Sequence, residues 1–398
     1  MRQRKPDAPK KVRRRLVMNK LHWRKFHREM LRIVLQVLRF PTEFFKLITV
    51  RRWYDLVAAR AIKRTPGCVA IGKEAGIYLI FPHNGILDSH LTALKEMLQA
   101  GITPIVVSNL PLSDVDRKNL APYTARVIER PNVGYDFGGY RDGIIDLCPI
   151  LKRLDRLWLL NDSVWFVPQQ TSWFNDARIL NKDFVAATSN YAMPRVDPCN
   201  FRDIVWNYNT DHKNFHYASY ALGFSSRLLH DAGFIRFWKG LNISNDKTRT
   251  VRRGEIGLSQ WIKRHGYTHG ATYEVRALNK ELENCSDEEI DRIAHELVIP
   301  DDDALEAVQS AVLQTDAATT EGRFDRICLI LTAVSRRASA YALPAYSIGQ
   351  GFHFLKKSPL WLSPGGAQIT LKLVERLDGP IGHEIKCEAM LLQRFTPQ

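Results

Sequence analysis

The chain has 398 residues, of which 45% are hydrophobic and 25% are charged, ordinary proportions for a soluble globular protein. The net charge is +15, but residues 1–64 contain 20 Lys/Arg and 4 Asp/Glu, whereas the rest of the chain contains 37 and 38. The basic charge therefore belongs to an N-terminal arm. The neutral remainder excludes a domain built around nucleic acid, because such a domain presents a basic stripe on its folded surface.

Six cysteines are spread along the sequence without a CxxC pair or a metal-ligand spacing, which is typical of a protein from a reducing compartment. Cys148 and Cys328 lie in apolar sequence, so we expect both thiols to be buried. The first twenty or so residues are polar and basic, without the apolar segment of a cleavable signal. These features predict a cytoplasmic protein.

The first predicted element is an amphipathic helix over residues 29–50, within an arm of residues 1–65. Its polar residues form one stripe opposite a broad apolar face: Arg32, Gln36, Arg39, Glu43 and Lys46. Four charges disfavour a helix that crosses the bilayer. The flanking arginines favour a helix, kinked at Pro41, that lies on an anionic membrane surface, here the inner face of the membrane. Alternatively, the apolar face packs on the protein itself or on a partner subunit.

From residue 66 onward, short apolar runs alternate with amphipathic stretches. The runs that predict strands are 76–81, 103–108, 125–128, 157–160 and 184–187, and the stretches that predict helices are 89–99, 113–120 and 140–153. Such an alternation predicts a doubly wound, mostly parallel α/β sheet with right-handed crossovers, in a domain of residues 66–280.

Beyond residue 190 the pattern is less regular. Residues 200–217 are rich in aromatic and polar side chains and are expected to form a loop over the site. The next predicted elements are a strand at 218–224 and helices at 225–241 and 255–265. Residues 281–398 are expected to form a mainly helical extension that completes the domain.

Polar residues follow the predicted parallel strands, at the edge of the sheet where open α/β sheets bind ligands. Asn84 and Asn109 follow the first two strands and are candidate contacts of a nucleotide. The next two strands are followed by a set of amides, carboxylates and a glycine suited to a sugar nucleotide and its metal ion: Asn132, Gly134, Asp136, Asn161 and Asp162. Gly134, with Gly138 and Gly139, would let the backbone approach a ligand closely, although an ordinary turn explains them as well.

Five motifs, in order, resemble the rhamnan synthesis F family of polysaccharide glycosyltransferases between about residues 76 and 360. They are Asn132-x-Gly-Tyr-Asp-Phe-Gly-Gly139, Leu159-Leu-Asn-Asp-Ser-Val164, His216-Tyr-Ala-Ser-Tyr-Ala221, Glu255-Ile-Gly-Leu258 ahead of Gly266-Tyr267, and Gly351-Phe-His-Phe-Leu-Lys356. Three positions depart from the family pattern. Ala218 replaces a Gln, His353 replaces a Pro, and Asn161 leaves only one carboxylate where many such enzymes have Asp-x-Asp.

The resemblance implies a GT-A-like fold and transfer of a sugar, with rhamnose as one candidate, from a nucleotide-sugar donor to a surface polysaccharide or lipopolysaccharide acceptor. Asp162 would meet the pyrophosphate through Mg²⁺ or Mn²⁺, since hard oxygen ligands and phosphates prefer such ions. The alternative is that Asp162 caps the next turn with Ser163. The single carboxylate puts a tightly bound metal in question.

Inverting sugar transfer needs a carboxylate base, and Glu255 is the best candidate for this role. The alternative is a first-turn glutamate that complements the helix dipole. Asp136 would supply a second carboxylate or hold donor hydroxyls, and His216 and Tyr220 would contact donor or acceptor. Asp136-Phe-Gly also spells the kinase metal motif, but the chain has no matching catalytic or glycine-rich loop.

Two other classes of function stay open at this stage. A glycoside hydrolase would use Asp162 and Glu255 and would not bind nucleotides. A carbohydrate-binding or scaffolding member of a polysaccharide assembly complex would keep the fold without turnover.

Overall fold

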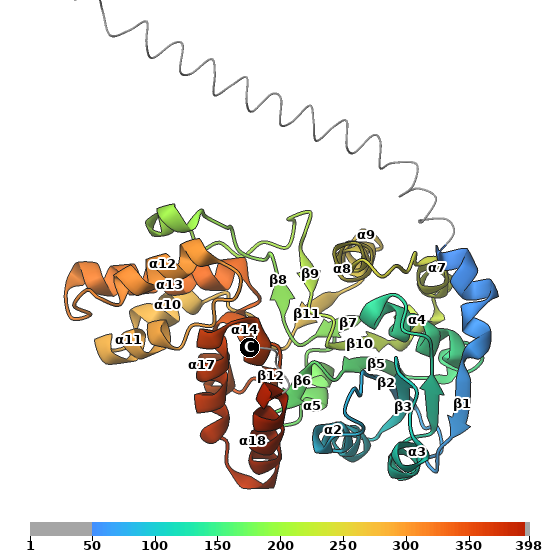
Figure 1. Ribbon diagram of the computed structural model, residues 1–398. Coiled ribbons are helices and arrows are strands. Elements are labelled where there is room, and N and C mark those ends of the chain that lie inside the picture. Colours follow the sequence, from blue (N-terminus) through green and yellow to red (C-terminus); the bar gives the residue numbers. More distant parts are fainter. Residues whose placement is uncertain (1–49, 395–398) are drawn as a thin grey trace, which may run out of the picture. The chain divides into compact units, whose positions relative to one another are not determined.

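An eight-stranded mixed sheet forms the centre of the protein in a computed structural model that describes residues 50–394 (Figure 1). The chain divides into two units, residues 1–56 and 57–398, and of the first unit only a helix over residues 50–56 is described. The helix predicted at 29–50 therefore lies outside the described residues, except for its last residue. None of the helices in the described range is long and apolar enough to cross a bilayer.

The strand order of the sheet is β1-β4-β3-β2-β5-β10-β7-β11. The strands span Lys63–Pro66 (β1), Glu74–Ile80 (β2), Ile102–Ser108 (β3), Arg126–Glu129 (β4), Arg156–Asn161 (β5), Phe184–Ala186 (β7), Ala221–Ser225 (β10) and His269–Ala271 (β11). β4, β3, β2 and β5 run parallel, β10 is antiparallel to β5 and β7, and β11 is parallel to β7. The predicted α/β sheet is thus present, and it is largely parallel.

The edge strand β1 pairs antiparallel with β4. It contains residues 63–65 of the predicted arm, which are therefore part of the sheet. The five predicted parallel strands are present with shifts of one or two residues at their ends. All seven residues of β3 are buried, as expected for a continuous apolar run in a sheet covered on both faces.

Helices connect and cover the strands. They are α2 (Asp88–Gln99), α3 (Asp114–Leu120), α4 (Tyr135–Leu147), α5 (Trp173–Ile179), α6 (Ser226–His230) and α7 (Ala232–Gly240). The sequence placed the α4 helix at 140–153, five residues too late. The helix predicted at 225–241 is interrupted, because the Asp231 carboxylate accepts a hydrogen bond from the Gly233 N–H and starts α7.

The segment after β7 differs most from the sequence prediction. β8 (Ser189–Asn190) pairs with β9 (His216–Tyr217), so the predicted loop ends in a short strand. A single run of helix then extends from α8 (Lys247–Val251) through a π-helical turn (Arg252–Ile256) into α9 (Gly257–Arg264). The predicted start of this helix at residue 255 is therefore wrong, because the side chain of Asp246 caps it eight residues earlier, at Lys247.

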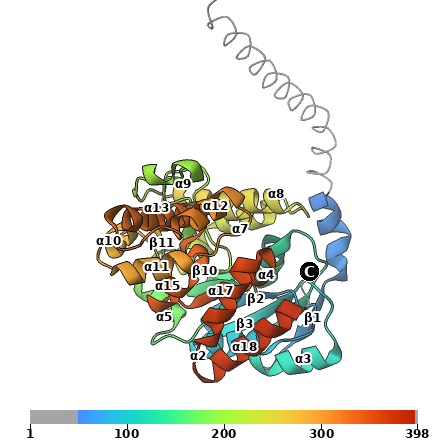
Figure 2. The ribbon, with the colours of Figure 1, turned by 60° about the vertical axis from the view of Figure 1, so that its left-hand side comes forward.

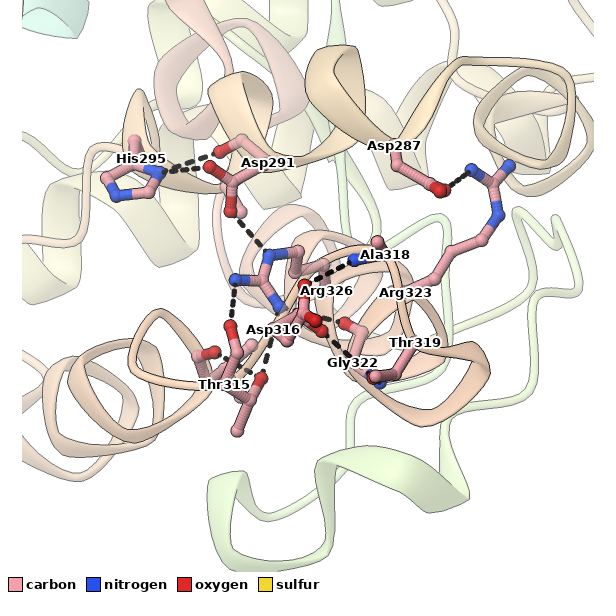
Figure 3. Close-up of polar contacts among 12 residues, drawn as sticks. Asp287, Asp291, His295, Thr315, Asp316, Ala318, Thr319, Gly322, Arg323 and Arg326 are labelled. Atoms are coloured by element: carbon pink, nitrogen blue, oxygen red, sulfur yellow. Dashed lines mark hydrogen bonds and ion pairs between the residues drawn. The ribbon is translucent and has the colours of Figure 1, made fainter.

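Residues 278–336 form a helical group with its own apolar core. Its helices are α10 (Leu278–Glu283), α11 (Asp287–His295), α12 (Asp303–Val312) and α13 (Thr320–Arg336). Figure 3 shows how the buried Arg326 of α13 joins this group, because its guanidinium donates to Asp291 of α11 at 2.6 Å and to both oxygens of Thr315, which follows α12. The helical character predicted for the C-terminal part is present.

The last part of the chain returns to the sheet. It contains α14 (Ser339–Ala342), α15 (Pro344–Gly349), β12 (Phe354–Lys356), α16 (Pro359–Leu362), α17 (Pro364–Glu375) and α18 (Gly379–Arg394). β12 pairs antiparallel with β6 (Val164–Phe166), directly after the end of β5. Figure 2 shows α18 beside α2 and α17, and Thr92 of α2 donates to Glu384 of α18 at 2.7 Å. All six cysteines are free; Cys328 is buried as predicted, but Cys148 is only half-buried.

Candidate active site

Three carboxylates from distant segments lie near one another at the carboxyl edge of the parallel strands. Asp136 lies in the first turn of α4, Asp162 directly follows β5, and Glu255 lies in the π-helical turn. The pKa of Asp136 is raised from 3.8 to about 6, first by burial and then by the negative charges of Glu255 and Asp162. The positive charges of Lys356 and Lys247 oppose this rise. The three carboxylates therefore act on one another electrostatically, as groups of a single site do.

The Asn161 side chain connects two sides of this site. Its Nδ2 donates to Asp136 Oδ2 at 3.0 Å, and its Oδ1 accepts from the backbone N–H and the hydroxyl of Ser163 at 3.1 and 2.6 Å. These contacts use both ends of the amide, so its orientation is fixed. They also show that Asn161, and not Asp162, makes the capping contacts with Ser163, which removes the main argument for Asp162 as a simple cap.

Asp162 is held ionised by the protein. Its Oδ2 accepts from the Phe81 backbone N–H at 2.6 Å and lies 3.5 Å from His90 Nε2. The His90 Nδ1 accepts from the Leu87 N–H, which leaves the ring proton on Nε2, facing the carboxylate. Burial alone would raise the pKa of Asp162, but the His90 contact, the Lys357 charge and the Phe81 N–H together lower it. Asp162 is therefore negatively charged at neutral pH.

Glu255 is held by two side chains of the His216–Ala221 motif. Its Oε1 accepts from the Ser219 hydroxyl at 2.5 Å, and its Oε2 lies 3.6 Å from His216 Nε2. His216 Nδ1 faces the Asn214 carbonyl at 2.7 Å, so Nδ1 bears a proton and Nε2 is directed toward the carboxylate. A glutamate between a hydroxyl and an imidazole can accept and pass on a proton.

The position of Glu255 in its helix rules out the alternative that it is a first-turn glutamate complementing the helix dipole. The helix begins at Lys247, so Glu255 is not in its first turn and does not complement the helix dipole there. The backbone around it is π-helical, a conformation that is frequent at functional sites. Gly254 lets this turn pack closely against α4, because a Cβ there would lie 2.4 Å from the ring of Phe137.

Two lysines of the β12 segment complete the site, and sequence reasoning did not select them. Lys356 Nζ donates to Ser163 Oγ at 2.9 Å and lies 4.4 Å from the centre of the Tyr220 ring. Lys357 Nζ donates to Glu388 Oε1 at 2.6 Å and to Ser89 Oγ at 3.0 Å. Tyr220 is buried, and burial raises its pKa. Lys356 and Ser219 were visible as members of the Gly351–Lys356 and His216–Ala221 motifs, whereas nothing in the sequence indicated His90.

The remaining predicted donor contacts are divided between two cavities. Asn84 lines a cavity of about 570 Å³ together with Asp162, Lys357 and the rings of Phe81 and Trp361. A second cavity, of about 340 Å³, lies at the ends of β3 and β4, and its lining includes Asn109 and Asn132.

Two of the residues predicted to contact the donor, Asn109 and Gly134, contact other protein groups instead. The buried Asn109 accepts from the Arg130 guanidinium at 2.6 Å. Gly134 adopts φ +88° at the start of α4, which only glycine adopts without strain, and a Cβ there would lie 2.8 Å from the Ile243 side chain. The space beside Gly134 is therefore filled by protein atoms.

The residues present give a divalent cation limited support. Within residues 50–394, no three His, Cys, Asp or Glu side chains are grouped as a metal site. Asp162 would provide one oxygen, since Oδ2 already accepts the Phe81 N–H. A cation bound there would take most of its ligands from donor phosphates and water, as Mg²⁺ commonly does.

Residues 104–297 match the family model described as rhamnan synthesis protein F. The resemblance predicted from the motifs is thereby confirmed. The matched range contains Asp136, Asp162 and Glu255, whereas Asn84 and Lys356 lie outside it.

Two individual proteins are similar to this chain. The uncharacterized protein y4gN of Sinorhizobium fredii (strain NBRC 101917 / NGR234) is 29% identical over 265 residues, which is 66% of this chain and 65% of that protein. Among solved structures, the mannosyltransferase PcManGT from Pyrobaculum calidifontis, in complex with GDP-Man and Mn²⁺, shares 12% identity and a TM-score of 0.30, over 91% of this chain and 97% of that one. A TM-score this low does not establish a common fold.

Proposed function

We propose that this protein is a glycosyltransferase of the GT-A type, which transfers a hexose from a nucleotide-sugar donor to a polysaccharide or lipid-linked acceptor of the cell surface. The observation that carries this proposal is the convergence of Asp136, Asp162 and Glu255 at the edge of the sheet where β4 and β5 end and the antiparallel β10 begins. The match to the rhamnan synthesis protein F family supports the same class of reaction. Rhamnose is the first donor sugar to test.

Glu255 is the proposed general base. The acceptor hydroxyl would lose its proton to Glu255 as its oxygen attacks the anomeric carbon of the donor sugar. Ser219 and His216 fix the carboxylate, and the His216 imidazole offers an exit for the proton. Asp136 would hold donor hydroxyls, because Asn161 fixes its carboxylate in a site where the charges of Glu255 and Asp162 act on it.

Asp162 is the proposed residue for the diphosphate end of the donor. Its fixed negative charge would act there through a divalent cation, which would offset the charge of the phosphate oxygens. The open cavity beside Asp162 supports this placement, because it offers room next to the carboxylate, with aromatic rings in its lining.

The proposal is tested by a screen of UDP-, GDP- and dTDP-sugars, dTDP-rhamnose among them, for binding and for release of the nucleoside diphosphate. At least one donor should bind the wild-type protein and be cleaved by it. Sugar binding without any nucleotide binding would favour the carbohydrate-binding or hydrolase alternatives instead.

A further inference from the structure

Lys356 stands apart from its neighbour in how its charge is compensated. The ammonium of Lys357 is buried and paired with the Glu388 carboxylate at 2.6 Å. Lys356 makes one hydrogen bond, to the neutral hydroxyl of Ser163, and within residues 50–394 it has no ion pair with a carboxylate. An ammonium has three N–H donors, so Lys356 has donors left for a ligand.

The position of Lys356 is fixed by the fold. β12 pairs with β6, and Lys356 is opposite Val164, so its side chain starts next to the Asp162–Ser163 segment. A hydrogen-bond chain then runs from Lys356 to Ser163, from Ser163 to Asn161, and from Asn161 to Asp136. Each group in this chain donates to the next, so the ammonium is tied to Asp136, whose pKa its charge lowers.

Placing a half-buried ammonium there is unfavourable by itself. Burial lowers the pKa of Lys356, and the charges of Asp136 and Glu255 only partly oppose this effect. The ammonium is nevertheless kept in the site with a single hydrogen bond and a contact with the Tyr220 ring, so its remaining N–H donors are available to an anionic ligand. The proposed donor brings such an anion, its diphosphate, into a site that already contains three carboxylates.

We propose that the Lys356 ammonium binds the diphosphate of the donor and stabilises it as the leaving group. This inference rests on the proposed function. In the step, the bond between the anomeric carbon and the diphosphate oxygen breaks, and its electron pair stays on that oxygen. The acceptor oxygen forms the new bond to the anomeric carbon, and its proton goes to Glu255. Lys356 exchanges no proton and offsets the charge that develops on the departing oxygen.

The test measures affinities of UDP, GDP, dTDP and ADP, and of the matching nucleosides, by calorimetry with and without EDTA. The variants are Lys356→Met, which removes the charge at similar length, and Lys356→Arg, which retains it. Lys372→Met, at an exposed site on α17, is the control. For the nucleoside diphosphate that binds the wild type best, Lys356→Met should weaken binding about 10- to 100-fold, as expected for a hydrogen bond to a charged group. Nucleoside affinity should not change, and the arginine variant should retain most of the diphosphate affinity.

Equal diphosphate affinity of the wild type and Lys356→Met would overturn the inference and leave the proposed function standing. Failure of the wild type to bind any of the four diphosphates would overturn both. A thermal melt confirms that each variant is folded. If Lys356→Met does not fold, Lys356→Gln replaces it, with the same expected loss and the same contradicting result.

Discussion

Lys356 and Asp136, 220 positions apart in the sequence, are joined by a hydrogen-bond chain through the side chains of Ser163 and Asn161. The chain leads from a cation near the end of the protein to a carboxylate in the first turn of α4. It fixes both groups relative to the end of β5. Substitution of any one of these four side chains should therefore disturb the groups at both ends of the hydrogen-bond chain.

The raised pKa of Asp136 predicts that the protein loses stability as the pH rises toward neutrality. Its pKa is raised in the folded state, from 3.8 to about 6, so the folded protein binds this proton more tightly than the unfolded chain does. Between these two values, the free energy of unfolding falls as pH rises. Asp136→Asn removes this effect and keeps an oxygen acceptor for Asn161. The variant should be more stable than the wild type at pH 7, by on the order of 2 kcal/mol, and the difference should vanish below about pH 4. Thermal melts from pH 4 to pH 8 measure it; a constant difference at all pH values would contradict the assignment.

Glu255→Gln separates catalysis from binding. Glutamine keeps an oxygen for the Ser219 hydroxyl but cannot accept a proton, so turnover should fall by about 10²–10⁴-fold, the usual contribution of a general base. Donor affinity should stay near the wild-type value. Glu306→Gln, at an exposed site on α12, is the control. Near-normal turnover of Glu255→Gln would move the base to another carboxylate.

Gly138 tests whether the glycines of the Asn132–Gly139 motif serve packing. A Cβ at Gly138 would lie 2.1 Å from the Val133 carbonyl oxygen, whereas the nearest atom to a Cβ at Gly257 is 3.6 Å away. Gly138→Ala should therefore destabilise the protein by about 1–3 kcal/mol. Gly257→Ala, inside the run of helix, should stabilise it by about 0.4–1 kcal/mol. Chemical denaturation measures both changes in the free energy of unfolding. Equal effects of the two substitutions would show that position 138 does not require a glycine for packing.

The basic arm is predicted to bring the protein to anionic membranes. Residues 1–49 contain 15 Lys/Arg and 3 Asp/Glu, and each basic residue near an anionic surface contributes roughly 1 kcal/mol. Deletion of residues 1–49 is preferable to a longer deletion, because residues 63–66 form β1 of the sheet. The truncated protein should remain in solution when the full chain sediments with anionic liposomes. If both pellet equally, the arm is not the membrane-binding segment.

The sequence predicted the parts of the site that depend on local pattern. Apolar runs place the ends of β2, β3, β4 and β5 within two residues, so the strand-end residues Asp162 and Asn161 follow directly. Lys356 could not be placed, because its position depends on the pairing of β12 with β6, about 190 residues earlier in the chain. The start of the Glu255 helix was missed because the capping signal of Asp246 precedes a polar stretch without apolar periodicity. The partner of Asp162, His90, lies on α2 and meets it only through the folded sheet.

The proposed activity is tested most directly by measuring nucleoside diphosphate release from the panel of nucleotide sugars by the wild type, Asp162→Asn and Asp155→Asn. Asp155 is exposed and lies just before the other end of β5, so it controls for loss of one carboxylate. The wild type should release the nucleoside diphosphate from at least one donor, Asp155→Asn should do so at an unchanged rate, and a folded Asp162→Asn should lose most of the rate. Wild-type rates in Asp162→Asn would place the donor site elsewhere, and no release from any donor by the wild type would contradict the proposed glycosyltransferase activity itself.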